Sequence, residues 1–157
     1  MNKLIVMMML AMVMVGCAEK MEEVVGLRFG DSPAEVKKSA EKHNYEITKD
    51  LEDYIKFEGN AKYVDMQWDN ISCEFNDGKL TEITLFSRQL PDKGCLEDMN
   101  KHMKSMCGAS RVVENEDFFE VYFGSKDENE GYLGNLTFIF DRPYGNKTTL
   151  SIYCVKE

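Results

Sequence analysis

The stretch ISCEFNDGKLTEITLFS, residues 71–87, constrains the fold more than any other. Ile71, Cys73 and Phe75 alternate with polar residues, and the run that follows Asp77-Gly78 alternates again. A period of two is typical of half-buried strands, and Asp-Gly between two such runs favours a tight two-residue turn. These residues therefore predict an antiparallel hairpin with one apolar face.

Other alternating runs predict further strands, in chain order 45–48, 54–57, 62–68, 110–113, 118–123, 136–140 and 148–155. Successive side chains of a strand point to opposite faces of a sheet. The alternation assigns these side chains to the core: Ile71, Cys73, Phe75, Ile83, Leu85, Phe119, Val121, Phe123, Leu136, Phe138, Phe140, Leu150, Ile152 and Cys154.

Two stretches predict helices. The first covers residues 33–42 after a capping Asp31 or Ser32, and the second begins after Asp92 and ends before Gly108. Asp and Ser are preferred at helix N-caps, and Gly is preferred just past a helix. One face of the second helix carries apolar side chains at helical spacing: Leu96, Met99, Met103 and Met106.

The order of helix and then strands occurs twice. An offset of 65 places Asn70 on Asn135 and Phe75 on Phe140. We therefore expect one domain, residues 24–157, made of two tandem helix-plus-antiparallel-sheet units at about 24–88 and 89–157. Short turns join antiparallel neighbours, so both helices should cover one face of a mostly antiparallel sheet in an α+β fold.

The first 17 residues predict export and a lipid anchor. Lys3 is followed by an apolar run from Leu4 to Val15, then by Gly16 and Cys17. This is the layout of a signal peptide, residues 1–16, and a small residue directly before cysteine resembles the bacterial lipobox, although Met14 stands where leucine is usual. The resemblance implies that Cys17 carries diacylglycerol and palmitate. Residues 17–23 would then tether the domain to the membrane, most simply the outer membrane.

The charge balance bears on the partner. The chain has 28 acidic and 19 basic residues, a net charge of −9. Such a chain repels phosphate backbones, so nucleic acid is not expected as a partner.

Four cysteines follow Cys17: Cys73, Cys95, Cys107 and Cys154. An even number in an exported chain favours disulfides. Cys95 and Cys107 would lie at opposite ends of one helix, about 18 Å apart and too far to bond. This leaves 73–107 with 95–154, or 73–95 with 107–154, and buried reduced thiols as the alternative.

No catalytic constellation is visible. His43 and His102 lack a motif around them, and His102 is poorly placed to activate Cys107. Soft metal ligands cluster in the second helix (Met99, His102, Met103, Met106 and Cys107), but the methionines also fit a buried stripe. We therefore expect no enzymatic activity, no metal and no cofactor.

The segments GLRFGDSPAEVKK, FNDGKLTEITL and MKSMCG resemble small lipoproteins of Bacteroides-like bacteria, and their fold is similar to the β-lactamase-inhibitor-protein and SmpA/OmlA group. The resemblance covers residues 24–157 and implies tandem helix-plus-sheet units whose open sheet face binds proteins. Cys107-Gly108 departs from the Tyr-Gly that usually ends the second helix. No inhibitory residue carries over.

Alternation also places aromatic side chains on the face away from the core: Phe86, Phe118, Tyr122 and Tyr153. Glu74, Glu82 and Glu120 lie among them. Aromatic rings with acidic neighbours suit a protein-contact surface, whereas strand propensity alone would also place aromatics there. We expect an envelope lipoprotein that binds an envelope or extracellular protein, or another ligand, through this face. A structural accessory of outer-membrane assembly, or an envelope enzyme without a recognisable motif, is the alternative.

Overall fold

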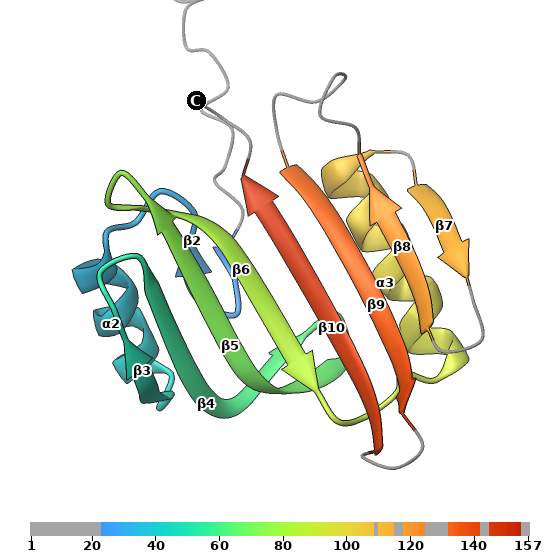
Figure 1. The fold of residues 1–157 in the computed structure, drawn as a ribbon, viewed down its shortest axis with the longest axis horizontal. Helices are drawn as coiled ribbons and strands as arrows, with labels where there is room; N and C mark the ends of the chain where they lie inside the picture. The colour runs from blue at the N-terminus through green and yellow to red at the C-terminus, as the bar shows by residue number, and fades with distance from the viewer. Residues whose placement is uncertain (1–22, 109, 115–117, 125–131, 142–144, 155–157) are drawn as a thin grey trace, which may run out of the picture.

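The computed structural model describes residues 23–108, 110–114, 118–124, 132–141 and 145–154. Its elements are shown in Figure 1 and follow in this order: β1 (Glu23–Val24), β2 (Leu27–Arg28), α2 (Pro33–Lys42), β3 (Glu46–Asp50), β4 (Tyr54–Tyr63), β5 (Met66–Asn76), β6 (Lys79–Ser87), α3 (Lys93–Cys107), β7 (Ser110–Glu114), β8 (Phe118–Phe123), β9 (Tyr132–Asp141) and β10 (Gly145–Cys154).

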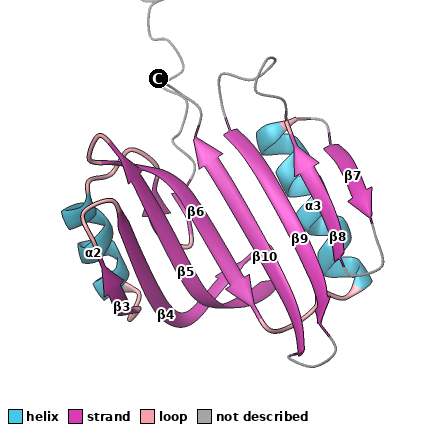
Figure 2. Ribbon diagram, in the orientation of Figure 1, coloured by secondary structure: helices cyan, strands magenta, loops and turns pink. Residues whose placement is uncertain are grey.

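Eight of these strands form one antiparallel sheet in the order β3-β4-β5-β6-β10-β9-β8-β7. β6 and β10 pair at its centre, so the sheet has β3 and β7 as its edges. β1 and β2 form a separate small hairpin. Figures 1 and 2 show α2 and α3 toward opposite ends of the large sheet. The predicted α+β class with a mostly antiparallel sheet is confirmed.

The hairpin predicted for residues 71–87 is formed by β5 and β6. Its turn residues Asp77 and Gly78 both have positive φ, 50° and 71°, as a type I′ turn requires. A Cβ on Gly78 would meet nothing within 4 Å. Backbone conformation rather than space therefore favours glycine here.

The strand predicted for 62–68 is wrong, because a turn interrupts it. β4 runs to Tyr63, and Val64 and Asp65 turn the chain with φ of 46° and 57°. A β-branched residue with positive φ is uncommon, so Val64 gives no turn signal in the sequence. The register shift between Glu58 and Ala61 marks an irregularity where the β4–β5 hairpin bends.

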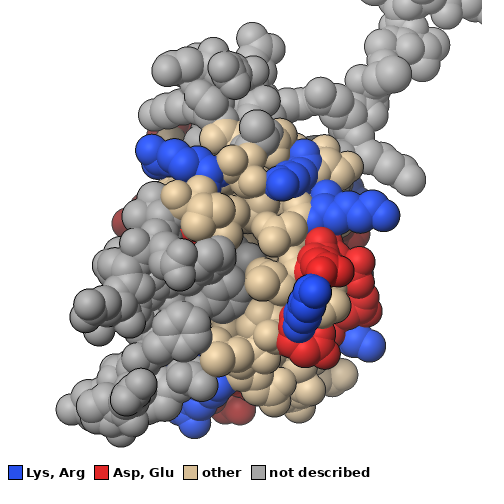
Figure 3. All heavy atoms as spheres, turned by 90° about the vertical axis from the view of Figure 1, so that its right-hand side faces the viewer, with Lys and Arg blue, Asp and Glu red and all other residues tan. Residues whose placement is uncertain are grey.

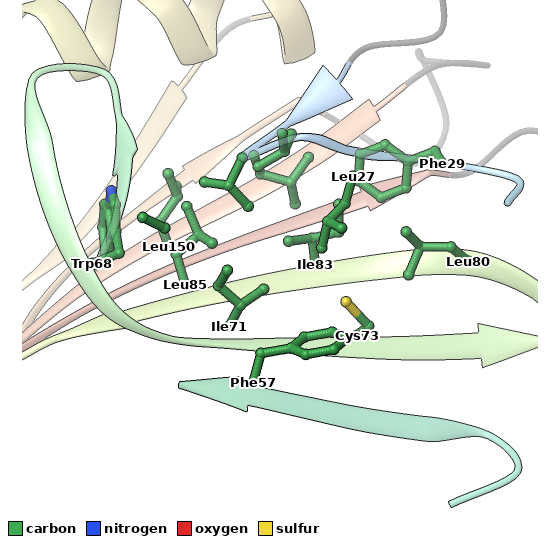
Figure 4. Close-up of a cluster of buried hydrophobic side chains, with 14 of the residues drawn as sticks. Leu27, Phe29, Phe57, Trp68, Ile71, Cys73, Leu80, Ile83, Leu85 and Leu150 are labelled. Atoms are coloured by element: carbon green, nitrogen blue, oxygen red, sulfur yellow. The ribbon is translucent and has the colours of Figure 1, made fainter. Parts of the chain in front are cut away.

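The bent end of the β4–β5 hairpin contributes to the core. The Trp68 indole N–H donates to the carbonyl of Tyr63 at 3.2 Å, and its side chain is fully buried. Figure 4 shows Trp68 on the curved part of the chain, near Leu85 and Leu150. The bend thus supplies the largest buried side chain to the core.

Both helices begin and end where the sequence indicates. Ser32 caps α2 in a capping box, in which the Ser32 N–H donates to a Glu35 carboxylate oxygen at 2.8 Å. Asp92 caps α3 by accepting a hydrogen bond from the Cys95 N–H at 2.8 Å. Gly108 follows the last turn of α3, and its N–H donates to the Lys104 carbonyl at 3.0 Å.

Strand register shows which face of the sheet is covered. Ile71, Leu85 and Leu150 lie directly opposite one another on β5, β6 and β10, and all three are fully buried. Both helices contribute to the same buried cluster, α2 with Val36 and Ala40, and α3 with Met99, Met103 and Cys107. The helices therefore cover the same face of the sheet.

The predicted inward positions can be checked where the structure describes the side chain. These are buried: Ile71, Cys73, Phe75, Ile83, Leu85, Val121, Phe123, Leu150 and Ile152. Cys154 is half-buried and packs against the cluster. The side chains of Phe119, Leu136, Phe138 and Phe140 lie outside the described part.

Candidate functional site

The sheet face opposite the helices, here called the open face, carries the candidate binding residues. Lys56, Ser72, Thr84 and Ser151 lie directly opposite one another on β4, β5, β6 and β10. In its strand, each of these four residues lies between two residues of the covered face. Their side chains therefore point away from the helices. The Thr84 and Ser151 hydroxyls are hydrogen-bonded at 2.7 Å. Much of the centre of this face is therefore lined by hydroxyl groups.

Three of the predicted aromatic residues lie on the open face. Phe86, Tyr122 and Tyr153 are half-buried, and the Tyr122 hydroxyl donates to Glu120 Oε2 at 2.9 Å. The Arg111 guanidinium carbon lies 5.0 Å from the centre of the Tyr122 ring, within the range of a cation–π contact. The Phe118 side chain lies outside the described residues.

The aromatic residues do not form one cluster. Phe86 is directly opposite Thr149, which is four residues from Tyr153 along β10, or about 13 Å along a strand. Tyr122 lies on β8, two strands beyond β10. The predicted patch is thus a set of separate rings across the face.

A row of four side chains crosses the open face. Tyr54, Glu74, Glu82 and Tyr153 lie directly opposite one another on β4, β5, β6 and β10. Burial raises the pKa of Glu82, a hydrogen bond from Thr84 lowers it, and the Glu74 carboxylate raises it again. Burial and the Glu82 carboxylate raise the pKa of Tyr153.

A hollow of about 370 Å³ opens on the same face over β4, β5, β6 and β10. All of its lining residues except Phe86 have polar or charged side chains: Lys56, Glu58, Asn70, Ser72, Thr84, Phe86, Arg88 and Thr149. Asn70 Oδ1 is buried and has no hydrogen-bond partner among the described residues. Buried polar atoms are nearly always hydrogen-bonded, so this one requires an explanation.

Sequence reasoning identified only Phe86 among these residues. Lys56, Asn70, Ser72 and Thr149 look like ordinary polar positions of half-buried strands, and Glu58 falls beyond the strand predicted for 54–57. The available signal was the alternation of Ile55 and Phe57 with Lys56, which points Lys56 to the open face. The convergence of residues from four strands depends on register, which the sequence leaves open.

No disulfide joins Cys73, Cys95, Cys107 and Cys154, all of which the structure describes. Neither predicted pairing is therefore formed in the structure. Cys73 is enclosed by the core, and burial raises the pKa of its thiol to about 12. The Cys95 thiol lies 3.6 Å from the carbonyl oxygen of Val64. Burial and the neighbouring carboxylates of Asp92, Asp65 and Asp98 raise its pKa, which makes it a weak nucleophile.

The two histidines have separate structural contacts. His102 Nε2 is hydrogen-bonded to the Tyr63 hydroxyl at 2.7 Å, which ties α3 to the bent hairpin. His43 Nδ1 lies 2.8 Å from the Ser39 carbonyl oxygen. Met99 and Met103 are fully buried, and Cys107 is nearly so. Among the residues that the structure describes, no three His, Cys, Asp or Glu side chains are grouped to hold a metal ion.

The predicted signal peptide, Cys17 and the predicted tether up to residue 22 lie outside the described residues, and Glu23, the last residue of that tether, belongs to β1. In the part that is described, neither helix has the length and apolar character needed to cross a membrane. Figure 3 shows acidic and basic side chains side by side on one flank of the molecule.

Comparisons with protein-family models, curated proteins and solved structures found no match for this chain.

Proposed function

We propose that this chain is a non-catalytic lipoprotein of the bacterial cell envelope, anchored through Cys17 and binding a protein partner through the open face. The anchor is supported by the order of Lys3, the apolar run and Gly16-Cys17. Two acyl chains or more give effectively stable membrane attachment. The domain would then be held at the membrane surface by residues 17–23.

The observation that carries the binding function is the asymmetry of the sheet. The helices cover one face, while Phe86, Tyr122 and Tyr153 are half-buried on the other. Tyr122 is held by Glu120 and Arg111. Aromatic side chains fixed in this way lose little conformational freedom on binding, and tyrosine is enriched at binding hot spots.

A duplication of one helix-plus-sheet unit would account for this asymmetry. α2 precedes β3 to β6, and α3 precedes β7 to β10. An offset of 65 residues relates the two segments in sequence. We infer two tandem units, about 24–88 and 89–157, which meet at the central pair β6–β10. The resemblance to the β-lactamase-inhibitor-protein and SmpA/OmlA group implies this architecture and an open face that binds protein.

Chemical crosslinking in envelope extracts tests the binding function. Wild-type protein should capture a defined partner, and the double variant Tyr122→Ser/Tyr153→Ser should lose it while its thermal midpoint stays close to that of the wild type. Ile47→Ser is the control, because Ile47 is 42% exposed and lies on the other face of the sheet, opposite Phe57. Equal capture by all three proteins would contradict the proposal.

A further inference from the structure

The side chains that line the hollow on the open face carry a net charge opposite to that of the chain, and the Asp69 carboxylate accepts a hydrogen bond from the Arg88 backbone N–H at 2.9 Å outside this lining. Lys56 and Arg88 line the hollow together with one carboxylate, Glu58, whereas the whole chain has a net charge of −9. The ion pairs among the described residues are Lys37–Asp50 and Lys93–Glu97, both elsewhere. Two cations therefore face the hollow without an ion-pair partner in the described part of the chain. This charge pattern favours an anionic ligand.

Asn70 adds a requirement for a hydrogen-bond donor. It lies directly opposite Glu58 on β4 and Phe86 on β6, so it is at the centre of the lining. Its Oδ1 atom is buried without a partner among the described residues. An amide oxygen is an acceptor, and because Asn70 as a whole is only half-buried, rotation of its side chain would bring Oδ1 to a ligand N–H in the hollow.

Phe86 adds an apolar contact beside Asn70. Its ring is half-buried, which leaves part of it available to a ligand. A volume of about 370 Å³ corresponds to roughly a dozen waters at liquid density, enough for the last one or two residues of a peptide. The hollow opens onto a sheet face with further half-buried aromatic rings, over which the remainder of a longer chain can lie.

We propose that this hollow binds the C-terminal carboxylate of a polypeptide partner. The carboxylate faces the Arg88 guanidinium, whose planar fork matches its two oxygens, and Lys56 adds positive charge on the other wall. A peptide N–H donates to Asn70 Oδ1, and an apolar terminal side chain packs on Phe86. The inference rests on the proposed function, since it assigns a chemical identity to what the open face binds.

Fluorescence anisotropy with peptide pools tests this directly. The probe is a dye-labelled pool of hexapeptides Gly-Ser-Gly-Ala followed by two varied residues, prepared once with a free carboxyl terminus and once amidated. Wild-type protein should bind the free-acid pool about tenfold more tightly than the amidated pool, a difference of about 1.4 kcal/mol. Arg88→Gln should weaken binding of the free-acid pool by a similar factor and reduce the difference between the pools.

The matched control is Arg28→Gln, because Arg28 is an exposed arginine on β2, outside the large sheet. It should bind both pools as the wild type does. Asn70→Leu should weaken the binding of both pools, because free-acid and amidated peptides alike would lose Asn70 Oδ1 as a hydrogen-bond acceptor. Lys56→Gln is the second charge variant if Arg88→Gln does not fold.

The proposal would be overturned if the wild type bound the two pools equally or bound neither. It would also be overturned if Arg88→Gln and Lys56→Gln both kept the preference for the free-acid pool. Sodium glucuronate is included as a competitor, and binding of glucuronate without the peptides would also overturn it. These results are separable from the proposed function. Peptide binding that fails while capture dependent on Tyr122 and Tyr153 persists would reject this site alone, and the reverse result would reject the capture function alone.

Discussion

Glu74 and Glu82 lie directly opposite each other on β5 and β6, with Tyr54 and Tyr153 as the next residues of the row. Like charges in this position destabilise a sheet. The pKa of Glu82 is raised, first by burial and then by Glu74. The fold therefore retains an electrostatic cost at this point of the open face.

We expect Glu82→Gln to stabilise the protein at neutral pH. Because the pKa of Glu82 is higher in the folded protein than the ordinary 4.5, the folded state binds more protons than the unfolded chain. The contribution of Glu82 to the free energy of unfolding therefore decreases as the pH rises from about the ordinary value through the folded pKa. In urea unfolding at pH 7, the free energy of unfolding of the variant should be higher than that of the wild type. This difference should become smaller toward pH 4.

The control for this charge change is Glu46→Gln, at an exposed position on the edge strand β3. A stabilisation by Glu82→Gln that is the same at pH 7 and at pH 4 would show that the raised pKa is not its cause.

Gly134 lies under α3, and a side chain there should destabilise the fold. A Cβ at this position would overlap the Met103 methyl group and would lie 3.5 Å from both Cys107 Sγ and a Phe123 ring carbon. Gly134→Val should lower the free energy of unfolding by about 1–3 kcal/mol, as overpacking does. Gly94→Ala in the first turn of α3 is the control, because its Cβ would make only an ordinary contact with Asp92.

A double-variant cycle identifies the cause of the loss at Gly134. If Met103 is the obstacle, the losses caused by Gly134→Val and Met103→Ala should be less than additive when combined. Strict additivity in chemical denaturation would contradict the packing explanation.

The core thiol should resist alkylation. Cys73 is fully buried with its pKa raised to about 12, and the reactive form of cysteine is the thiolate. In the native protein at pH 8, iodoacetamide should modify the half-buried Cys154 before Cys73, as read by peptide mass spectrometry. In 8 M urea the two sites should react at similar rates. Early modification of Cys73 in the native protein would mean that the core opens readily.

Cys17 should carry the lipid anchor. The mature N-terminal peptide should begin at Cys17 and have the mass of an acylated cysteine, and labelled palmitate should be incorporated into the protein. Cys17→Ser should abolish the label and move the protein out of the membrane fraction. A wild-type mature chain that begins elsewhere, with unmodified Cys17, would reject the lipobox interpretation.

The local elements could be predicted because their signals are local. Asp77-Gly78 marks its turn, and Ser32 and Asp92 mark helix starts that the structure confirms. The turn at Val64-Asp65 could not be predicted, because its first residue with positive φ, Val64, is β-branched and carries no turn signal. The small β1–β2 hairpin was missed because its two strands have only two residues each, too few to show an alternating pattern.

For the candidate site, the sequence could predict only which face of the sheet its residues lie on. Alternation correctly places Phe86, Tyr122 and Tyr153 away from the core, but it cannot show that they are far apart. The hollow depends on how four strands align, and on Arg88, which follows the end of β6. Such convergence depends on tertiary register, which a single sequence does not determine.

The central pair β6–β10 also affects how the sheet forms during folding. Its six paired positions join Glu82–Ser87 to Thr148–Tyr153, so partners such as Leu85 and Leu150 are 65 residues apart in the chain. Contacts this distant form slowly, because the entropy of closing the intervening chain is lost before pairing stabilises it. Until β10 is in place, β6 and β9 each have an unpaired edge that another chain can extend. Aggregation during folding should therefore begin at the middle of the finished sheet, at strands that the native protein never exposes as edges.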